Sequence, residues 1–150
     1  MKKTFFILAL LLGFGSHAQN TNKVSIERVI TTFYDGFNAR DSVKMKLMLS
    51  KNFLYQDVDE VYGKKIVKTE DINTVIKTIS GIPKTTQFRQ ELGELKINMD
   101  DQIANVWVAY KFYLYDAYYH CGVSSFQLAK EDGDWKIISL LDHHSKEGCK

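Results

Sequence analysis

The fold is decided by residues 102–142, which read QIANVWVAYKFYLYDAYYHCGVSSFQLAKEDGDWKIISLLD. Apolar and polar side chains alternate through most of this stretch, which is the two-residue period of half-buried strands. Turn-forming residues interrupt the alternation at Asp116-Ala117 and at residues 131–134. The stretch therefore predicts three long antiparallel strands joined by two tight turns, and any small-molecule site should be built on them.

The predicted pairing divides these strands into two faces. We expect the more apolar face to be concave, with Val106, Val108, Tyr110, Phe112, Leu114, His120, Gly122, Ser124, Phe126, Leu128, Ile137, Ser139, Leu141 and His143. The other face should carry Trp107, Lys111, Tyr113, Cys121, Val123, Gln127, Ile138, Leu140 and His144. A register slip of one residue would exchange the two faces. The apolar members of the second face predict a homodimer interface on the convex side of the sheet.

The chain before this stretch begins with helical patterns. Apolar residues recur at steps of three and four over residues 24–37, which is typical of an amphipathic helix. Asp41 should cap a second, short helix with Val43, Leu47 and Met48 facing inward.

A third helix is expected after a short strand at residues 51–57 and a loop at residues 58–65. Thr69 should cap this helix, and Pro83 should end it. Two further strand-like segments follow, 85–92 and 94–99. Helices first and antiparallel strands after predict an α+β domain, in which three helices pack on one face of a curved, mostly antiparallel sheet and enclose a pocket.

The first twenty residues, MKKTFFILALLLGFGSHAQN, predict an export signal. Two lysines precede an apolar run of about ten residues, too short to span a bilayer, and small residues occupy the cleavage positions. Cleavage after Ala18 would leave a single domain, residues 19–150, in the periplasm or outside the cell. The alternative is a short membrane anchor that stays attached.

The predicted cleavage also changes the charge balance. It removes Lys2 and Lys3 from the 20 basic residues, which leaves 18 basic against 18 acidic residues. A neutral domain without a basic stripe is a poor partner for nucleic acid or, after cleavage, for anionic membranes.

Two cysteines, Cys121 and Cys149, lie outside the predicted signal. In an oxidising compartment such a pair tends to form a disulfide, and the alternative is two free thiols. The predicted register sets Cys121 opposite His144, five residues before Cys149. A C-terminal tail that folds back would bring the two sulfurs together.

The element order resembles the nuclear transport factor 2-like superfamily, whose cone-shaped α+β fold is shared with ketosteroid isomerase and SnoaL-type polyketide cyclases. The matching segments are FYDGFNARD (33–41), VWVAYKFYLYDAYYHCGVSSFQL (106–128) and WKIISLLD (135–142), followed by Gly148-Cys149. Through HCGVSSFQL and WKI the chain resembles more narrowly a group of small exported bacterial proteins named for lumazine binding. That group usually has a threonine and two arginines after the last-strand aspartate, whereas His143, His144 and Ser145 stand here. The superfamily contains enzymes and pure binding proteins, and lumazine is not carried over as a ligand.

Seven side chains are candidates for the pocket: Tyr34, Tyr55, Asp57, Tyr110, Phe112, His120 and Ser124. A carboxylate facing a tyrosine resembles the isomerase arrangement, in which the carboxylate moves a proton beside a carbonyl and a hydroxyl stabilises the enolate oxygen. Asp57 is the only carboxylate that the predicted register places for this role. The alternatives are an exposed acid at Asp57, ordinary core tyrosines and an exposed or hydrogen-bonded His120.

Three functions follow from these residues. The first is an exported, non-catalytic domain that binds an unknown small apolar or aromatic molecule without a cofactor. The second is a small isomerase- or cyclase-type enzyme with Asp57 as general base and Tyr34 or Tyr110 as oxyanion donor. The third is a structural dimer whose pocket is filled by its own side chains, such as Phe112, Phe126 and Tyr110.

We predict the binding domain, because the sequence holds no complete catalytic set. Gly-rich phosphate loops and the GxSxG, HExxH and CxxC motifs are absent from it. Zinc sites at His120 with His143 or at Cys121 with His144 are disfavoured, because strand alternation puts the two pairs on opposite faces. Asp57 separates the first two functions: a carboxylate in the cavity near a tyrosine hydroxyl favours the enzyme, and one pointing to solvent excludes it.

Overall fold

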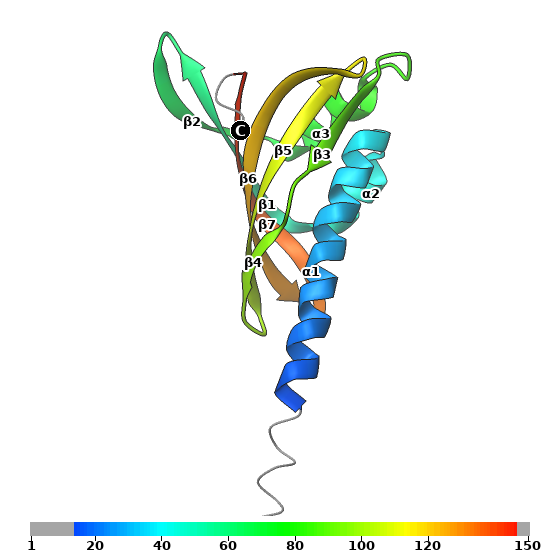
Figure 1. Cartoon of the computed structure of the whole chain (residues 1–150), viewed down its shortest axis with the longest axis vertical. Coiled ribbons are helices and arrows are strands. Elements are labelled where there is room, and N and C mark those ends of the chain that lie inside the picture. The colour runs from blue at the N-terminus through cyan, green and yellow to red at the C-terminus, as the bar shows by residue number, and fades with distance from the viewer. Residues whose placement is uncertain (1–13, 147–150) are drawn as a thin grey trace, which may run out of the picture.

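The computed structural model describes residues 14–146, with side chains from residue 21 onward. Three helices lie on one side of a curved, seven-stranded sheet that does not close on itself (Figure 1). The helices are α1 (Phe14–Ala39), α2 (Ser42–Met48) and α3 (Ile72–Gly81). The strands are β1 (Leu49–Val61), β2 (Lys64–Glu70), β3 (Phe88–Leu92), β4 (Lys96–Met99), β5 (Ile103–Leu114), β6 (Ala117–Glu131) and β7 (Asp134–Ser145). This architecture confirms the predicted α+β class.

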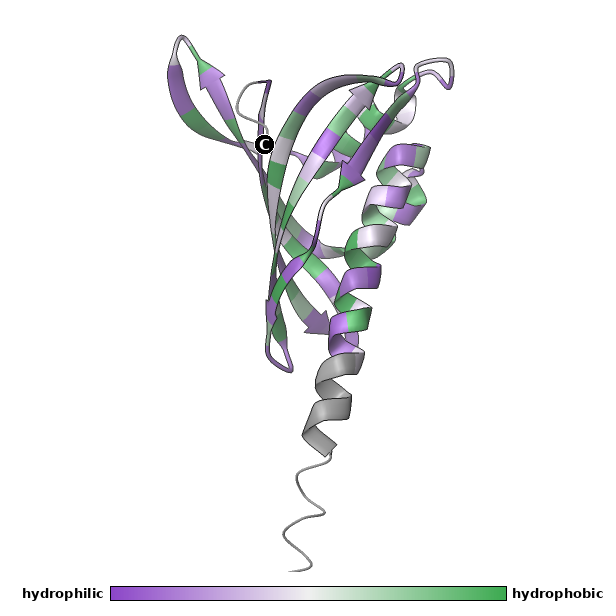
Figure 2. Cartoon of the chain, in the orientation of Figure 1, coloured by the Kyte–Doolittle hydropathy of each residue, from purple (hydrophilic) through white to green (hydrophobic). Residues whose placement is uncertain are grey.

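The strand order is β2-β1-β7-β6-β5-β3, with β4 paired to β5. β1 and β7 run parallel, and the other described strand pairs are antiparallel. Figure 2 shows hydrophobic and hydrophilic residues alternating along the long strands, as expected for a sheet with one buried face. Among the helices that the structure describes, none has the length and apolar character that crossing a membrane requires. Most of the predicted export signal lies outside the described residues, so its cleavage stays a prediction.

Helix α1 follows the predicted amphipathic pattern. Ile26, Ile30 and Phe33 point at the sheet and are buried. The helix ends where Arg40 takes a positive φ of 58°. Asp41 then caps α2 as predicted, because its carboxylate accepts hydrogen bonds from the backbone N–H groups of the second and third residues of that helix at 3.0 and 2.9 Å.

The predicted inward face of α2 is partly wrong. Val43 and Leu47 are 66% and 57% exposed, whereas Met45 is completely buried. Helix α2 has only two turns and crosses tightly over Gly36, where an added Cβ would lie 2.9 Å from the Met45 backbone nitrogen. Because the two helices cross so closely at Gly36, Met45 is the α2 residue that packs against α1.

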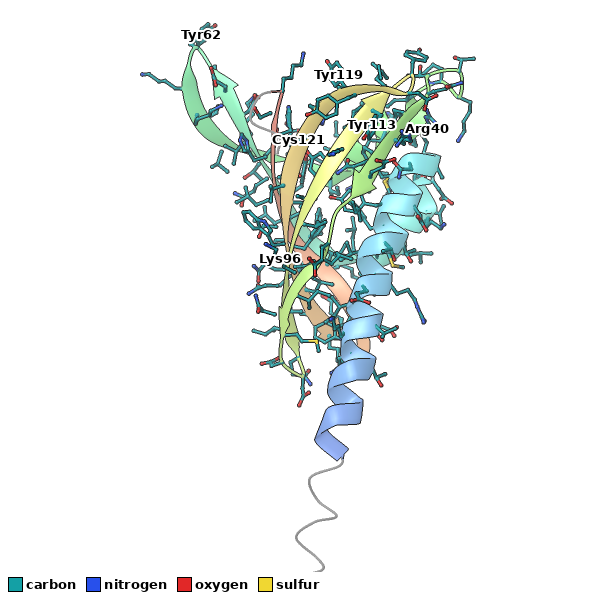
Figure 3. All side chains as sticks on the ribbon, in the orientation of Figure 1. Arg40, Tyr62, Lys96, Tyr113, Tyr119 and Cys121 are labelled. Carbon is teal, nitrogen blue, oxygen red and sulfur yellow. The ribbon has the colours of Figure 1, made fainter. Side chains whose placement is uncertain are left out.

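The segment after α2 forms a long hairpin instead of the predicted short strand and loop. β1 continues to Val61, and a two-residue turn at Tyr62-Gly63, with φ of 51° and 74°, leads into β2. Positive φ at both turn positions suits the twist of a two-residue hairpin. The hairpin projects beyond the body of the fold, and the fully exposed Tyr62 lies at its tip (Figure 3). Because β2 runs on to Glu70, α3 is capped by Asp71 and not by the predicted Thr69.

The three long strands form as predicted, with turns at Tyr115-Asp116 and Asp132-Gly133. The β5–β6 register also agrees with the predicted faces: Val108 lies opposite Ser124, and Phe112 lies opposite His120.

The predicted faces of β7 are wrong beyond Ile137. Ile137 pairs with Leu128, but Ser139 pairs with Gln127, so Ile138 is an extra residue in a β-bulge. The extra residue reverses the alternation of the rest of the strand. Leu140, Asp142 and His144 therefore lie on the concave face, and Ser139, Leu141 and His143 lie on the convex face.

Candidate functional site

A cavity of about 190 Å³ lies between the helices and the concave face of the sheet. One wall is apolar and comes from α1 and α3, with Phe33, Phe37, Ile72, Ile76 and Ile79. The polar groups come from the sheet, with Tyr55 on β1, Tyr110 on β5, His120 on β6, and Asp142 and His144 on β7. Apolar walls with a few convergent polar groups are typical of small-molecule sites.

A buried hydrogen-bond network organises the polar end of the cavity. The Asp142 Oδ2 atom accepts a hydrogen bond from the Tyr110 hydroxyl at 2.8 Å, and Oδ1 accepts one from the Ser124 hydroxyl at 2.5 Å. The hydroxyls of Tyr34 and Ser124 are 2.8 Å apart. When Asp142 is ionised, Ser124 donates to the carboxylate and Tyr34 donates to Ser124.

The register of the sheet explains why these groups meet. Ser124 lies directly opposite Asp142 on the neighbouring strand. Tyr110 lies opposite Gly122, and a Cβ atom added at Gly122 would be 2.3 Å from the tyrosine Cζ and hydroxyl oxygen. The glycine therefore leaves the space that the tyrosine ring crosses, and the ring carries its hydroxyl from β5 to the carboxylate on β7.

Burial sets the protonation of this network. It raises the pKa of Asp142, and the Asp57 charge raises it further, against the lowering effect of the hydrogen bonds from Ser124 and Tyr110. Burial and the Asp142 charge also raise the pKa of Tyr34, of Tyr55 and of Tyr110. The three tyrosines therefore stay neutral and can donate hydrogen bonds.

Two histidines stand beside this network. The His120 ring stacks on Phe112, with centroids 4.8 Å apart and an interplanar angle of 5°. The ring centroid of His144 is 5.1 Å from that of His120. Burial and the neighbouring His144 lower the pKa of His120, which favours its neutral form. The His144 side chain is 47% exposed, so it marks the solvent-facing side of the cavity.

The structure brings most of the predicted pocket residues together. Tyr34, Tyr55, Tyr110, Phe112 and His120 line the cavity. Ser124 is completely buried beside it, within the Asp142 network.

Asp57 is not the only well-placed carboxylate, and that part of the prediction is wrong. It is absent from the cavity lining, although its side chain is only 16% exposed, and Asp142 on the neighbouring strand faces the cavity instead. The error came from the β7 bulge, which the sequence pattern did not reveal. One signal was available: Asp142 follows the largely apolar run at residues 137–141 of the predicted last strand, where a charged side chain is costly unless it is hydrogen-bonded.

Cys121 lies one residue away from its predicted pairing position, opposite Ser145 and not opposite His144. Because Cys149 lies outside the described residues, the disulfide remains a prediction. The two considered zinc pairs are not assembled, because His120 and His144 share the concave face while His143 lies on the other.

No family model and no curated protein matches this chain. Solved structures do resemble it. An NTF2-like protein with a cystatin-like fold from Novosphingobium aromaticivorans has a TM-score of 0.72 at 9% identity, covering 99% of this chain and 95% of its own. An NTF2-like protein of unknown function from Shewanella baltica has a TM-score of 0.64 at 17% identity, covering 83% and 94%.

A third similar structure is a scytalone dehydratase-like protein from Novosphingobium aromaticivorans, with a TM-score of 0.65 at 13% identity, covering 90% of this chain and 93% of its own. At these identities the likeness concerns the backbone arrangement, which hosts both enzymes and binding proteins. With its three helices on a curved sheet and a cavity between them, the chain has the nuclear transport factor 2-like fold.

Proposed function

We propose that the chain binds a small, largely apolar or aromatic molecule in the cavity and holds the polar end of that molecule at Asp142. The supporting observation is the carboxyl group of Asp142, set among hydroxyls at the polar end of a largely apolar cavity. Burying such a group costs stability, and groups with a shifted pKa in a cleft are frequent at functional sites.

The size of the cavity limits the ligand. Its volume of about 190 Å³ exceeds that of an apolar cavity of about 150 Å³ that holds benzene, and is below the range of about 300 Å³ or more for drug-sized ligands. One ring or two fused rings therefore fit. The stacked rings of Phe112 and His120 favour a planar molecule, and Asp142 favours a hydrogen-bond donor such as a phenol or an enol.

The test is a fluorescence titration with 2-naphthol, compared with naphthalene, which has the same rings without the hydroxyl. Asp142→Asn should weaken the binding of 2-naphthol and leave that of naphthalene nearly unchanged. Val75→Phe, which narrows the cavity from α3, should weaken both. Saturable binding of neither compound, or equal binding by wild type and Val75→Phe, would contradict the proposal. If 2-naphthol binds as expected, native mass spectrometry of protein purified from its own host would identify the natural ligand that it retains.

A second candidate is a proton-transfer enzyme with Asp142, and not Asp57, as general base. The favouring observation is that Asp142 has a raised pKa and faces the cavity together with the Tyr55 hydroxyl. Asp142 would take a proton from the carbon beside a carbonyl while a tyrosine donates a hydrogen bond to the enolate oxygen, and the proton would then return to carbon. Exchange of the α-protons of 2-tetralone in D2O, followed by NMR, measures this step. Exchange that Asp142→Asn does not slow would exclude it.

Export and assembly belong to the same proposal. Cleavage after Ala18 would give a mature protein that starts at Gln19, and a Cys121–Cys149 bridge would hold its C-terminus to β6. Intact-mass analysis of the exported protein tests both. The mass shows whether residues 1–18 have been removed, and two thiols that alkylate without reduction would exclude the bridge.

We expect the convex face, with Ile103, Trp107 and Leu141 exposed, to form a homodimer. Light scattering at micromolar concentration tests it, and Trp107→Glu should then give monomers. A monomeric mass for the wild-type protein would contradict the interface.

A further inference from the structure

We propose that Asp57, Asp142 and His144 form a binding site for a divalent first-row transition-metal ion at the polar end of the cavity. One ligand atom from each residue lies within 4.8 Å of the others. The proposal does not depend on the small-molecule function, because it concerns an ion held by protein atoms alone.

The topology explains why the three residues converge. β1 and β7 are parallel neighbours, and Asp57 lies directly opposite Asp142 in their register. Their carboxylates therefore lie side by side on the same face. His144 is two residues beyond Asp142, so the bulge at Ile138 places it on this face as well.

In the part of the chain that the structure describes, the two carboxylates are only partly compensated in charge, by Lys68 opposite Asp57 and by His144 at 3.9 Å from Asp57. Neither Asp57 nor Asp142 forms an ion pair with a lysine or arginine there. The negative charge of Asp57 raises the pKa of Lys68, but the Lys68 ammonium group forms its ion pair with Asp59. The Asp57 and Asp142 carboxylates still repel one another, and a bound divalent ion would remove that repulsion.

One oxygen of this group is also unsatisfied. Asp57 Oδ1 is buried and has no hydrogen-bond partner among the described residues. The Nδ1 atom of His144 is 3.9 Å away, which is too far for a hydrogen bond. A buried acceptor without a donor is costly, and a metal ion between the oxygen and the imidazole nitrogen would satisfy both atoms.

The ligand types indicate the class of metal. Imidazole with carboxylates suits ions such as Zn²⁺ and Co²⁺, whereas Ca²⁺ prefers six to eight oxygen ligands. Bonds of about 2.0–2.2 Å place ligand atoms about 3–4 Å apart, and the distance from His144 to Asp57 already falls in that range. Asp142 is oriented by Ser124 and Tyr110, as metal-binding carboxylates usually are by neighbouring donors.

The experiment titrates chelator-treated full-length protein with Co²⁺, followed by its visible absorption, and with Zn²⁺ by calorimetry. We expect one ion per chain, and at least about tenfold weaker binding in Asp57→Asn and in His144→Gln. His143→Gln is the matched control, because this exposed histidine precedes His144 in the chain but lies on the opposite face of the sheet. Circular dichroism checks that each variant folds.

Three results would overturn the metal site: no saturable Co²⁺ or Zn²⁺ binding, unchanged affinity in Asp57→Asn, or equal loss in His143→Gln. Binding of Ca²⁺ as tight as that of Zn²⁺ would overturn the assigned class. Titration of Asp57→Asn with 2-naphthol in the presence of chelator separates this proposal from the small-molecule one. That variant should keep naphthol binding, so failure of one site leaves the other testable.

Discussion

Gly122→Ala should displace Tyr110 from Asp142 and strongly destabilise the protein. The added Cβ would lie 2.3 Å from the Cζ atom and hydroxyl oxygen of Tyr110, about 1.1 Å less than the 3.4 Å at which ordinary contact begins. It would also lie 2.6 Å from the backbone oxygen of His143, so β7 blocks an easy escape. A ring shift of about 1 Å would break the 2.8 Å hydrogen bond to Asp142.

The size of the effect follows from two costs. Crowding of a well-packed site costs about 1–3 kcal/mol, and loss of a hydrogen bond to a charged group costs about 1.5–3 kcal/mol. We therefore expect the free energy of unfolding to fall by about 3–5 kcal/mol. Domains of this kind have about 5–15 kcal/mol in total, so the variant should still fold, with a much lower urea midpoint.

Urea unfolding followed by circular dichroism measures the change, and a 2-naphthol titration of the folded variant reports whether Asp142 has lost its orientation. Gly81→Ala is the matched control, because no atom lies within 4 Å of an added Cβ there and the residue ends α3 with an ordinary φ. It should not lower stability. A Gly122→Ala protein within about 1 kcal/mol of wild type would refute the packing argument, because it would show that the ring and β7 move freely.

Three smaller predictions concern the same network and the start of α2. Because the folded-state pKa of Asp142 is raised, its contribution to the free energy of unfolding is complete below the unfolded pKa of about 3.9 and is lost as pH rises through the folded pKa. The stability difference between wild type and Asp142→Asn, measured in urea from pH 3 to 8, should therefore shift against wild type as pH rises, and a flat difference would contradict the raised pKa. Tyr34→Phe removes the hydroxyl beside Ser124 and should cost about 0.5–1.5 kcal/mol in the same assay, whereas no loss would mean that this bond contributes nothing. Asp41→Ala removes the cap of α2 and should cost about 1 kcal/mol, while Asp41→Asn, which can still cap, should cost less.

The fold followed from features that are local in sequence. The three- and four-residue apolar spacing of α1, the cap at Asp41 and the alternation of β5 and β6 each reflect an interaction between a few neighbouring residues. These patterns were enough for the element order apart from β2, for the concave face of two strands and for five of the cavity-lining side chains.

Two features escaped because their causes are not local. All residues of β2 except Lys68 are exposed, so this strand has no buried face and its sequence shows no apolar alternation. The β7 bulge arises from pairing with β6. The adjacent apolar pairs Ile137-Ile138 and Leu140-Leu141 fit either phase of the alternation, so both phases are plausible before the pairing is known. For this reason the sequence did not predict that Asp142 and His144 face the cavity, and it indicated Asp57 as the only well-placed carboxylate.

Because of the bulge at Ile138, the chemistry of the cavity depends on the register of β7 against β6 and not only on the identity of its residues. If Ile138 paired regularly with Gln127, with no bulge, every later residue of β7 would lie on the opposite face of the sheet. In that register Leu141 would lie opposite Ser124 and face the cavity in place of Asp142, and the polar end of the cavity would become apolar. A protein with this fold can therefore gain or lose an acidic pocket through a one-residue shift in strand register, without any substitution in the pocket itself.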